Sequence, residues 1–168
     1  MDKRLPHIVH KAQVLCRENQ EYKSILMEYM RELSKRSPLE RVKFAHKVID
    51  DSIENDKSNS KTRCKKGCAF CCYHKIEVTP SEAQNIKSLN ANKNMNALSC
   101  PFLASDNACG IYEERPIICR LTHVVSEPDH CEIDSGKEVE HLMVEKASLM
   151  ALAYFSLESN LLVLREHI

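Results

Sequence analysis

The segment RCKKGCAFCCYHK, residues 63–75, places four cysteines within nine positions, and two of them are adjacent. The whole chain has nine cysteines, and an odd number leaves one thiol over in any complete disulfide framework. Cys71 and Cys72 would pair with each other only through a strained ring. Metal ligation is therefore the favoured interpretation, and redox-active or structural disulfides and unligated core thiols are the alternatives.

The spacing CxxxCxxCC brings thiolates together on one turn of helix or around a knuckle, as a tetrahedral metal requires. Four further cysteines follow, so eight candidate ligands fall within residues 64–131: Cys64, Cys68, Cys71, Cys72, Cys100, Cys109, Cys119 and Cys131. They suffice for two four-thiolate sites or for one site with thiols to spare. Adjacent residues point in different directions, so Cys71 and Cys72 are expected to serve different metals, unless one of them is not a ligand. Cys16 lies outside the set, beside an apolar helical stripe.

Basic and imidazole side chains surround the cysteines. Positive charge that favours the thiolate form comes from Arg63, Lys65, Lys66, Arg115 and Arg120, although a solvated face is the alternative role for each of them. The histidines near the cysteines are His74, His123 and His130, and hydrogen bonding is expected of each before ligation. Thiolate ligands suit zinc and iron equally, including iron in an iron–sulfur cluster.

Length and charge limit the classes of protein that remain. The 168 residues predict a single domain, 1–168, and 24 basic residues balance 24 acidic ones. With no net charge to attract phosphates and only 5% aromatic residues, a nucleic-acid partner is not expected. No apolar run is long enough for a signal peptide or a membrane span, which predicts a cytoplasmic protein without a membrane partner. A protein partner is left open.

Hydrophobic periodicity predicts a mainly α fold with an irregular cysteine-rich middle segment. Residues 1–55 are expected to form a helical hairpin: one long amphipathic helix over 5–35, then a second helix that begins at the capping box Ser37-Pro38-Leu39-Glu40. Residues 64–131 should be irregular, apart from a short strand at 75–79 and a helix after a second box, Thr79-Pro80-Ser81-Glu82. A C-terminal helix is predicted over 138–165.

The two cysteine segments together resemble the YkgJ-type cysteine-cluster family, whose members are described as zinc- or iron-chelating proteins. The resemblance covers CKKGCAFCC, then CPFL, then CGIYEERPIICR, about residues 64–120. By position, the family's cysteines match Cys64, Cys68, Cys71, Cys72, Cys100, Cys109 and Cys119, and its basic turn matches Arg115-Pro116 and Arg120. Cys131 falls outside the matched part. A related branch, the flagellin lysine-N-methylases, has a similar cluster and is thought to use an iron–sulfur centre with S-adenosylmethionine.

Two functions from different classes therefore compete. The favoured hypothesis is a metal-binding protein that chelates zinc or iron, with an iron–sulfur centre included, through its thiolates. The alternative is a cluster-dependent enzyme, either a lysine N-methyltransferase or an oxidoreductase. The chain has three glycines and no GxGxxG loop or P-loop for a nucleotide, and the sequence identifies no catalytic residue. Metal analysis and an absorption spectrum of protein purified without oxygen are the measurements that would narrow these hypotheses most.

Overall fold

The computed structural model describes residues 4–158 and 160–168 and is mainly helical, as the sequence predicts. Its α-helices are α1 (Arg4–Glu18), α2 (Gln20–Ser34), α3 (Pro38–Glu54), α4 (Pro80–Ser88), α5 (Ile117–Leu121) and α6 (Glu145–Leu157). Short 3₁₀ turns are η1 (Lys57–Lys61), η2 (Phe70–Tyr73), η3 (Tyr112–Glu114), η4 (Pro128–Cys131) and η5 (Leu164–Glu166). Two short strands are β1 (Glu77–Val78) and β2 (Leu162–Val163). Within the described part of the chain, no helix is both long and apolar enough to cross a membrane.

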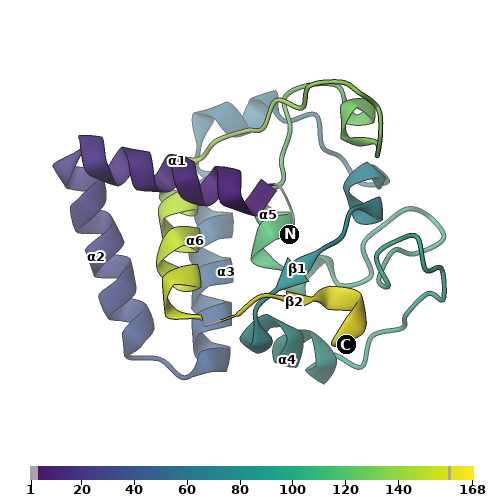
Figure 1. Ribbon diagram of the computed structural model, residues 1–168, viewed down its shortest axis with the longest axis horizontal. Helices are drawn as coiled ribbons and strands as arrows, with labels where there is room; N and C mark the ends of the chain where they lie inside the picture. The colour runs from purple at the N-terminus through teal and green to yellow at the C-terminus, as the bar shows by residue number, and fades with distance from the viewer. Residues whose placement is uncertain (1–3, 159) are drawn as a thin grey trace.

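Helix α6 lies at the centre of the helical part of the molecule. Every residue from Ala147 to Tyr154 is buried, on all sides of the helix, and a helix that is apolar all round must be enclosed by others. It packs against α1, α2 and α3. Figure 1 shows α6 between α2 and α3, with α1 crossing in front at one end. The order of this region therefore comes from apolar contacts with one central helix.

The single long helix predicted over 5–35 is wrong, because the chain breaks at Asn19. This residue leaves the helical conformation (φ −134°, ψ 116°), and its side chain accepts a hydrogen bond from the Glu21 N–H at 2.8 Å. Asparagine favours such an N-cap, which starts a new helix in a new direction. Both α1 and α2 can then lie against α6 (Figure 1). A periodic apolar stripe runs through such a break unchanged, so periodicity alone did not reveal it.

The second helix of the predicted hairpin begins where the capping box places it. Ser37 precedes α3, and the Glu40 carboxylate accepts from the Ser37 N–H at 2.9 Å. Pro38 occupies the first helical position, where its missing N–H costs nothing. However, α2 and α3 do not pack side by side as a simple hairpin. Helix α6 lies between them and contacts both (Figure 1).

The predicted C-terminal helix over 138–165 is too long. Helix α6 covers Glu145–Leu157 only, and Glu158 has extended backbone (φ −103°, ψ 136°); Ser159 lies outside the described residues. After it, β2 pairs antiparallel with β1, with Glu77 opposite Val163 and Val78 opposite Leu162. Leu164, placed at helical spacing in the sequence, enters the core from η5 instead. Leu164 is therefore a core residue, but it belongs to η5 and not to a helix that continues from α6.

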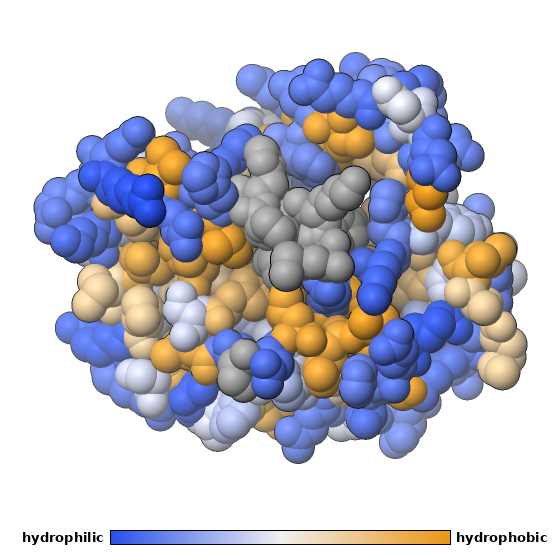
Figure 2. Space-filling model, in the orientation of Figure 1, coloured by the Kyte–Doolittle hydropathy of each residue, from blue (hydrophilic) through white to orange (hydrophobic). Residues whose placement is uncertain are grey.

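The cysteine-rich segment leaves the helical region and returns to it by way of the small sheet. Strand β1 and helix α4 follow η2, and Thr79 begins α4 with the capping box that the sequence predicts. The loops beyond α4 lie on the opposite side of the sheet from α2 and α6 (Figure 1). The face of the molecule shown in Figure 2 is mostly hydrophilic along α1. Apolar side chains gather nearer its middle.

Candidate metal centre

A tight turn presents the first two cysteines of the cluster. The Cys68 N–H donates to the Lys65 carbonyl at 3.0 Å, and Gly67 adopts φ +85° at the third position of this turn. A residue with a side chain is strained in that left-handed conformation, so CKKGC needs its glycine. The turn returns the chain on itself, and the charge of Cys64 then acts on the Cys68 thiol. CKKGC therefore forms a tight turn, or knuckle, that carries Cys64 and Cys68.

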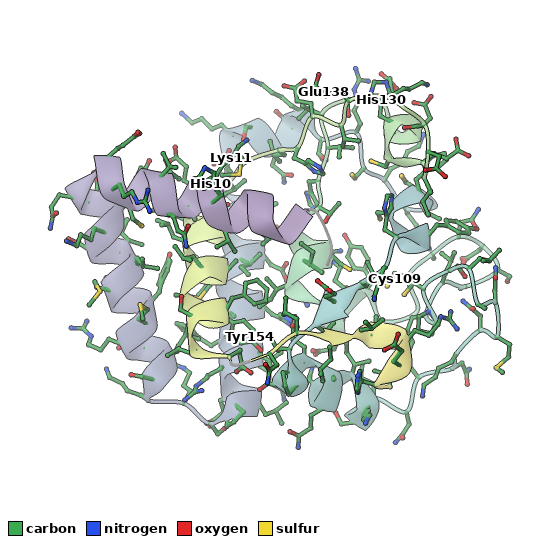
Figure 3. The ribbon with its side chains drawn as sticks, viewed as in Figure 1. His10, Lys11, Cys109, His130, Glu138 and Tyr154 are labelled. Atoms are coloured by element: carbon green, nitrogen blue, oxygen red, sulfur yellow. The ribbon has the colours of Figure 1, made fainter. Side chains whose placement is uncertain are left out.

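The second cysteine segment, residues 100–111, is a hairpin. Leu103 and Cys109 form an antiparallel bridge, and the Gly110 N–H donates to the Phe102 carbonyl at 2.8 Å. A Cβ atom on Gly110 would lie 3.2 Å from that carbonyl oxygen, which explains the glycine there. The Cys100 N–H donates to the Cys72 carbonyl at 2.6 Å and joins the hairpin to η2. Figure 3 shows Cys109 on this loop side of the molecule, away from Tyr154 on α6.

The thiols of these segments influence one another. Burial raises the pKa of the Cys68, Cys100 and Cys109 thiols, and the charge of Cys71 raises all three further. The pKa of Cys72 is raised by its hydrogen bond with Cys71, by burial and by the charges of Cys71, Cys100 and Cys119. Like charges act in this way only at close range. Seven cysteines therefore form one network, linked directly or through a shared neighbour: Cys64, Cys68, Cys71, Cys72, Cys100, Cys109 and Cys119.

Backbone N–H groups point at several of these sulfurs. A hydrogen bond from the residue two positions further on lowers the pKa of Cys68 (from Phe70), of Cys100 (from Phe102) and of Cys109 (from Ile111), against the larger effect of burial. The Val124 N–H lies 3.4 Å from the Cys64 sulfur. Hydrogen bonds of this kind stabilise a thiolate more than a neutral thiol. The backbone donors therefore offset part of the effect of burial on the pKa of Cys68, Cys100 and Cys109.

Cys64 joins the network through Cys68, and Cys131 lies on η4 beside His74. The Cys64 sulfur contacts the Thr122 carbonyl at 3.9 Å as well as Val124. The Cys131 carbonyl accepts from the His74 ring Nε2 at 2.7 Å, and this bond ties η4 to η2. The ligand role of Cys131 stays a prediction.

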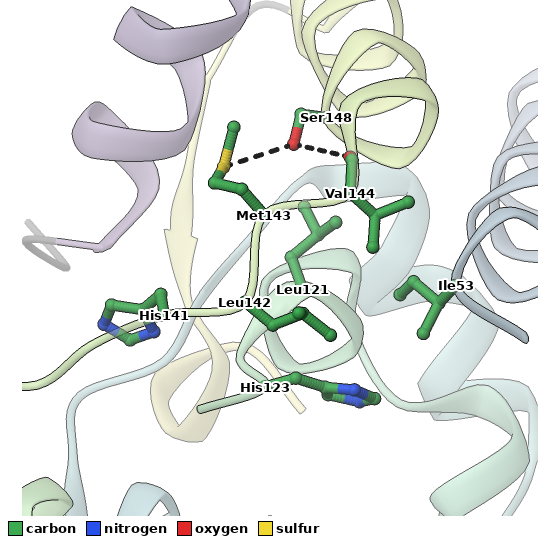
Figure 4. Close-up of a pocket in the computed structure, with 8 residues that line it drawn as sticks. All are labelled: Ile53, Leu121, His123, His141, Leu142, Met143, Val144 and Ser148. Carbon is green, nitrogen blue, oxygen red and sulfur yellow. Dashed lines mark hydrogen bonds between the residues drawn. The ribbon is translucent and has the colours of Figure 1, made fainter. Parts of the chain in front are cut away.

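The histidines near the cysteines act in hydrogen bonds or line cavities. His74 Nε2 donates to Cys131, and His130 Nδ1 lies 2.7 Å from the Glu138 carbonyl; Figure 3 labels both members of this second pair. His123 lines a small apolar cavity with Leu121 and Val144 (Figure 4). Its Nδ1 is buried without a partner in the described residues. Burial and the charge of Arg115 lower the pKa of His123, so it is a neutral side chain of this cavity.

Arg120 is not on a solvated face, which was the alternative to a role at the cysteines. It is 2% exposed, its Nε donates to the Arg115 carbonyl at 2.9 Å, and it forms an ion pair with Asp50 on α3. It also donates to His46 Nδ1 at 3.0 Å. Burial, together with the charge of Arg120, lowers the pKa of His46 to about 3, so this imidazole is a neutral acceptor. Arg120 thus fixes the residues around Cys119 to the helical region.

Of the other basic residues, Arg115 and Lys65 each lower the pKa of a cysteine thiol, whereas Arg63 forms an ion pair elsewhere. Arg115 stacks on the Tyr112 ring at 3.9 Å, and its charge lowers the pKa of Cys109 against the effect of burial. Lys65 acts in the same direction on Cys68, again against burial. Arg63, in contrast, is exposed and forms an ion pair with Glu127 at 3.8 Å.

Sequence reasoning missed two charged residues that support the cysteines. Arg165, near the C-terminal end, donates to the carbonyls of Asn96 and Ser99, and its charge lowers the pKa of Cys100 against burial. Glu82, buried on α4, accepts from the Ile117 N–H at the start of α5. No spacing in the sequence links either residue to a cysteine. The capping box marks Glu82 as the partner of Thr79, but not as a partner of α5.

Thiolate sulfur is a ligand that soft metals prefer. The cysteine sulfurs of the described residues, however, do not converge on one point. Clustered thiolates with N–H donors and nearby cations are the donor set that zinc and iron prefer. In residues 4–158 and 160–168, however, no three or more Cys, His, Asp or Glu side chains are arranged to hold a metal ion directly. The donor chemistry therefore fits, and ligation would have to draw the sulfurs closer together.

Comparison with known proteins identifies the same segment. Residues 63–146 match the family model CxxCxxCC, described as "Putative zinc- or iron-chelating domain". No curated protein and no solved structure matches the chain. The match includes all eight candidate ligands and half of the chain, and it confirms the cysteine-cluster family recognised from the sequence. The chain therefore belongs to the CxxCxxCC family of zinc- or iron-chelating domains.

Proposed function

We propose that the protein binds zinc or iron through the thiolates of residues 64–119, and that its helices support this centre. The observation that carries the proposal is the set of backbone N–H groups aimed at Cys64, Cys68, Cys100 and Cys109. Thiols that served only as small apolar core residues would gain little from such donors. Thiolates that bind a metal need them, because hydrogen bonds to sulfur offset the accumulated negative charge.

The proposal includes more than one metal ion per chain. Seven thiols belong to one network, and Cys71 acts on Cys68, Cys72, Cys100 and Cys109. A single tetrahedral ion uses four ligands, so three thiols would remain. A multinuclear centre with shared thiolates uses all seven. A reducing compartment such as the cytoplasm would keep these thiols available.

Purification without oxygen, followed by elemental analysis and an absorption spectrum, tests this function. More than one zinc or iron per chain is the expected result. Zinc would give a colourless protein, and iron with inorganic sulfide a brown one. One zinc, with no iron and no sulfide, would refute the multinuclear centre. Protein that contains no metal and takes none up after reduction would refute the function itself.

One observation favours a cluster-dependent enzyme as a second candidate. A groove of about 880 Å³ lies directly beside Cys100. Its walls include Phe70, Tyr73, Leu98, Ile133 and Val163. Apolar grooves of this size accept ligands, and a substrate seated there would lie next to the centre. The two candidates separate by activity: methyl transfer or electron transfer by the metal-loaded protein supports the enzyme, whereas metal binding without either activity supports the binding protein.

A further inference from the structure

Glu82 is a buried carboxylate that joins two helices. It is 2% exposed, although it belongs to a capping box, a motif that usually lies at the surface. Its Oε2 accepts from the Thr79 N–H at 2.9 Å and from the Thr79 hydroxyl at 3.1 Å, at the start of α4. Its Oε1 accepts from the Ile117 N–H at 2.7 Å, at the start of α5. One side chain therefore holds the first turn of both helices.

Helix α5 depends on this contact. It has only five residues, and Pro116 before it provides no side-chain cap. A helix this short is not stable by itself. Cys119 lies two residues after Ile117, about 3 Å along the helix axis. Any shift in the start of α5 would therefore move Cys119 relative to Cys72, the thiol on which its charge acts.

The carboxylate is itself anchored to the central helix. The Tyr154 hydroxyl on α6 lies 2.7 Å from the Thr79 hydroxyl oxygen. Because Thr79 gives its own proton to Glu82, Tyr154 must donate to Thr79. Tyr154 and Thr79 are both 0% exposed. A chain of buried hydrogen bonds thus runs from α6 through the start of α4 to the start of α5.

The other capping box shows that this arrangement is not required for capping. Glu40 occupies the same position in its box and bonds the Ser37 N–H and hydroxyl, but it is exposed and lies in the helical region. Burial of a carboxylate opposes its ionisation, and burial does raise the pKa of Glu82. Unlike Glu40, Glu82 is buried, and its carboxylate also accepts a hydrogen bond from the Ile117 N–H.

We propose that Glu82 is a positioning residue of the metal centre: its carboxylate sets the start of α5 and thereby the place of the Cys119 thiolate. This proposal rests on the proposed metal binding. The amide of Glu82→Gln keeps the size of the side chain but turns an N–H₂ group toward one of the N–H donors, so one of the two helices loses its bond.

The test compares cobalt(II) binding, with its thiolate charge-transfer absorption, in metal-free wild type and three variants. Glu82→Gln should weaken binding about 10- to 100-fold and reduce the thiolate absorption. Thr79→Val breaks the same buried chain but leaves the Ile117 bond intact, and Glu40→Gln alters the exposed box. Glu40→Gln should bind cobalt as the wild type does, and Thr79→Val, which removes the anchor of Glu82 but not its bond to Ile117, should weaken binding less than Glu82→Gln does. Equal binding by Glu82→Gln and wild type would overturn the positioning role.

Two further measurements keep the proposal falsifiable if Glu82→Gln folds poorly. The Ile117 amide of the metal-free wild type should be protected from hydrogen exchange, and free exchange would overturn the proposal. In a Cys119→Ser background, Glu82→Gln should cause no additional loss of cobalt affinity, and a full additional loss would also overturn it. Failure of the wild type to bind cobalt at all would instead refute the proposed function, and the positioning role with it.

Discussion

The helical region, formed by α1, α2, α3 and α6, and the cysteine region, residues 64–131, differ in how completely their characteristic side chains are buried. In the helical region entire side chains are buried: Leu33, Ile49 and Met150 are each 0% exposed. In the cysteine region, all eight candidate ligands are only partly buried. Residues 64–131 also contribute to the main core through β1, α4 and α5, with Val78, Ile86 and Ile117 at most 2% exposed. Apolar contact therefore orders the helical region and these three elements, and the cysteine side chains lie at the edge of this core.

This difference indicates where metal would matter. Burial of a leucine or isoleucine side chain contributes about 1.5 to 3 kcal/mol, and the main core of such contacts joins α3 and α6 to β1, α4 and α5. The turns that carry the cysteines add single bridges and backbone hydrogen bonds, which contribute about 1 kcal/mol each. We therefore expect the helical region to keep its structure without metal and the cysteine-bearing turns to depend on it. Four predictions test this separation, in order of decreasing effect.

The largest effect is expected from loss of a ligand. Cys109→Ser should lower metal content and the melting temperature of the metal-loaded protein, because ligation and folding of thiolate sites are coupled. Cys68→Ser should do the same. Elemental analysis and thermal melts with and without a chelator measure both quantities. In chelator, variants and wild type should melt alike.

Cys16→Ser is the matched control for this experiment. Cys16 is a partly buried thiol on α1, in the helical region, and packs beside a small apolar cluster. Its replacement should leave metal content unchanged. Full metal content and unchanged melting in both Cys68→Ser and Cys109→Ser would contradict the dependence of the cysteine region on metal.

The second effect concerns a core residue on α3. Ile49 on α3 is fully buried in the main core, and truncation of such a residue to alanine typically costs about 2 to 5 kcal/mol. Ile49→Ala should therefore reduce the free energy of unfolding by this amount, measured by urea denaturation. The loss should be the same in chelator and in metal, with metal content preserved. Metal loss in this variant would show that the two regions are not separable.

The third effect is a change of affinity without a change of fold. Burial raises the pKa of the Cys109 thiol and the Arg115 charge opposes it, so Arg115→Ala should weaken metal retention about 10- to 100-fold. Competition with a coloured chelator measures this, and the far-ultraviolet circular dichroism should not change. Arg63→Ala is the control, because Arg63 is exposed and paired with Glu127. Equal retention in both variants would show that Arg115 does not support the thiolates.

The sequence predicted what depends on local chemistry. The two capping boxes begin α3 and α4 where Ser37 and Thr79 stand, and CKKGC forms a turn around Gly67. These features need only neighbours within a few residues. The mainly α fold also follows from periodicity. The family could be recognised because its cysteine spacings are long and specific, and the match over residues 63–146 confirms it.

Contacts between distant segments could not be predicted in the same way. Asn19 divides an unbroken apolar stripe, and whether an asparagine caps a new helix depends on what α6 offers both halves. Leu164 has helical spacing but enters the core beside a strand. Arg165 and Glu82 reach the cysteine segments through the fold, from outside the matched motif or from a different helix. Periodicity and motif spacing in one sequence do not indicate which distant segments contact each other.

The smallest effect should come from the exposed capping box, and it tests the separation most sharply. Ser37 begins α3, and its N–H and hydroxyl both bond Glu40. Loss of a serine cap costs about 1 kcal/mol, so Ser37→Ala should lower the free energy of unfolding by about that amount. Because the box lies in the helical region, the loss should be equal in metal and in chelator, and cobalt affinity should be that of the wild type. Urea denaturation and cobalt titration measure the two quantities. A change in cobalt affinity would mean that a shift at the start of α3 alters the cysteines through the ion pair between Asp50 and Arg120. The two regions would then form one cooperative unit.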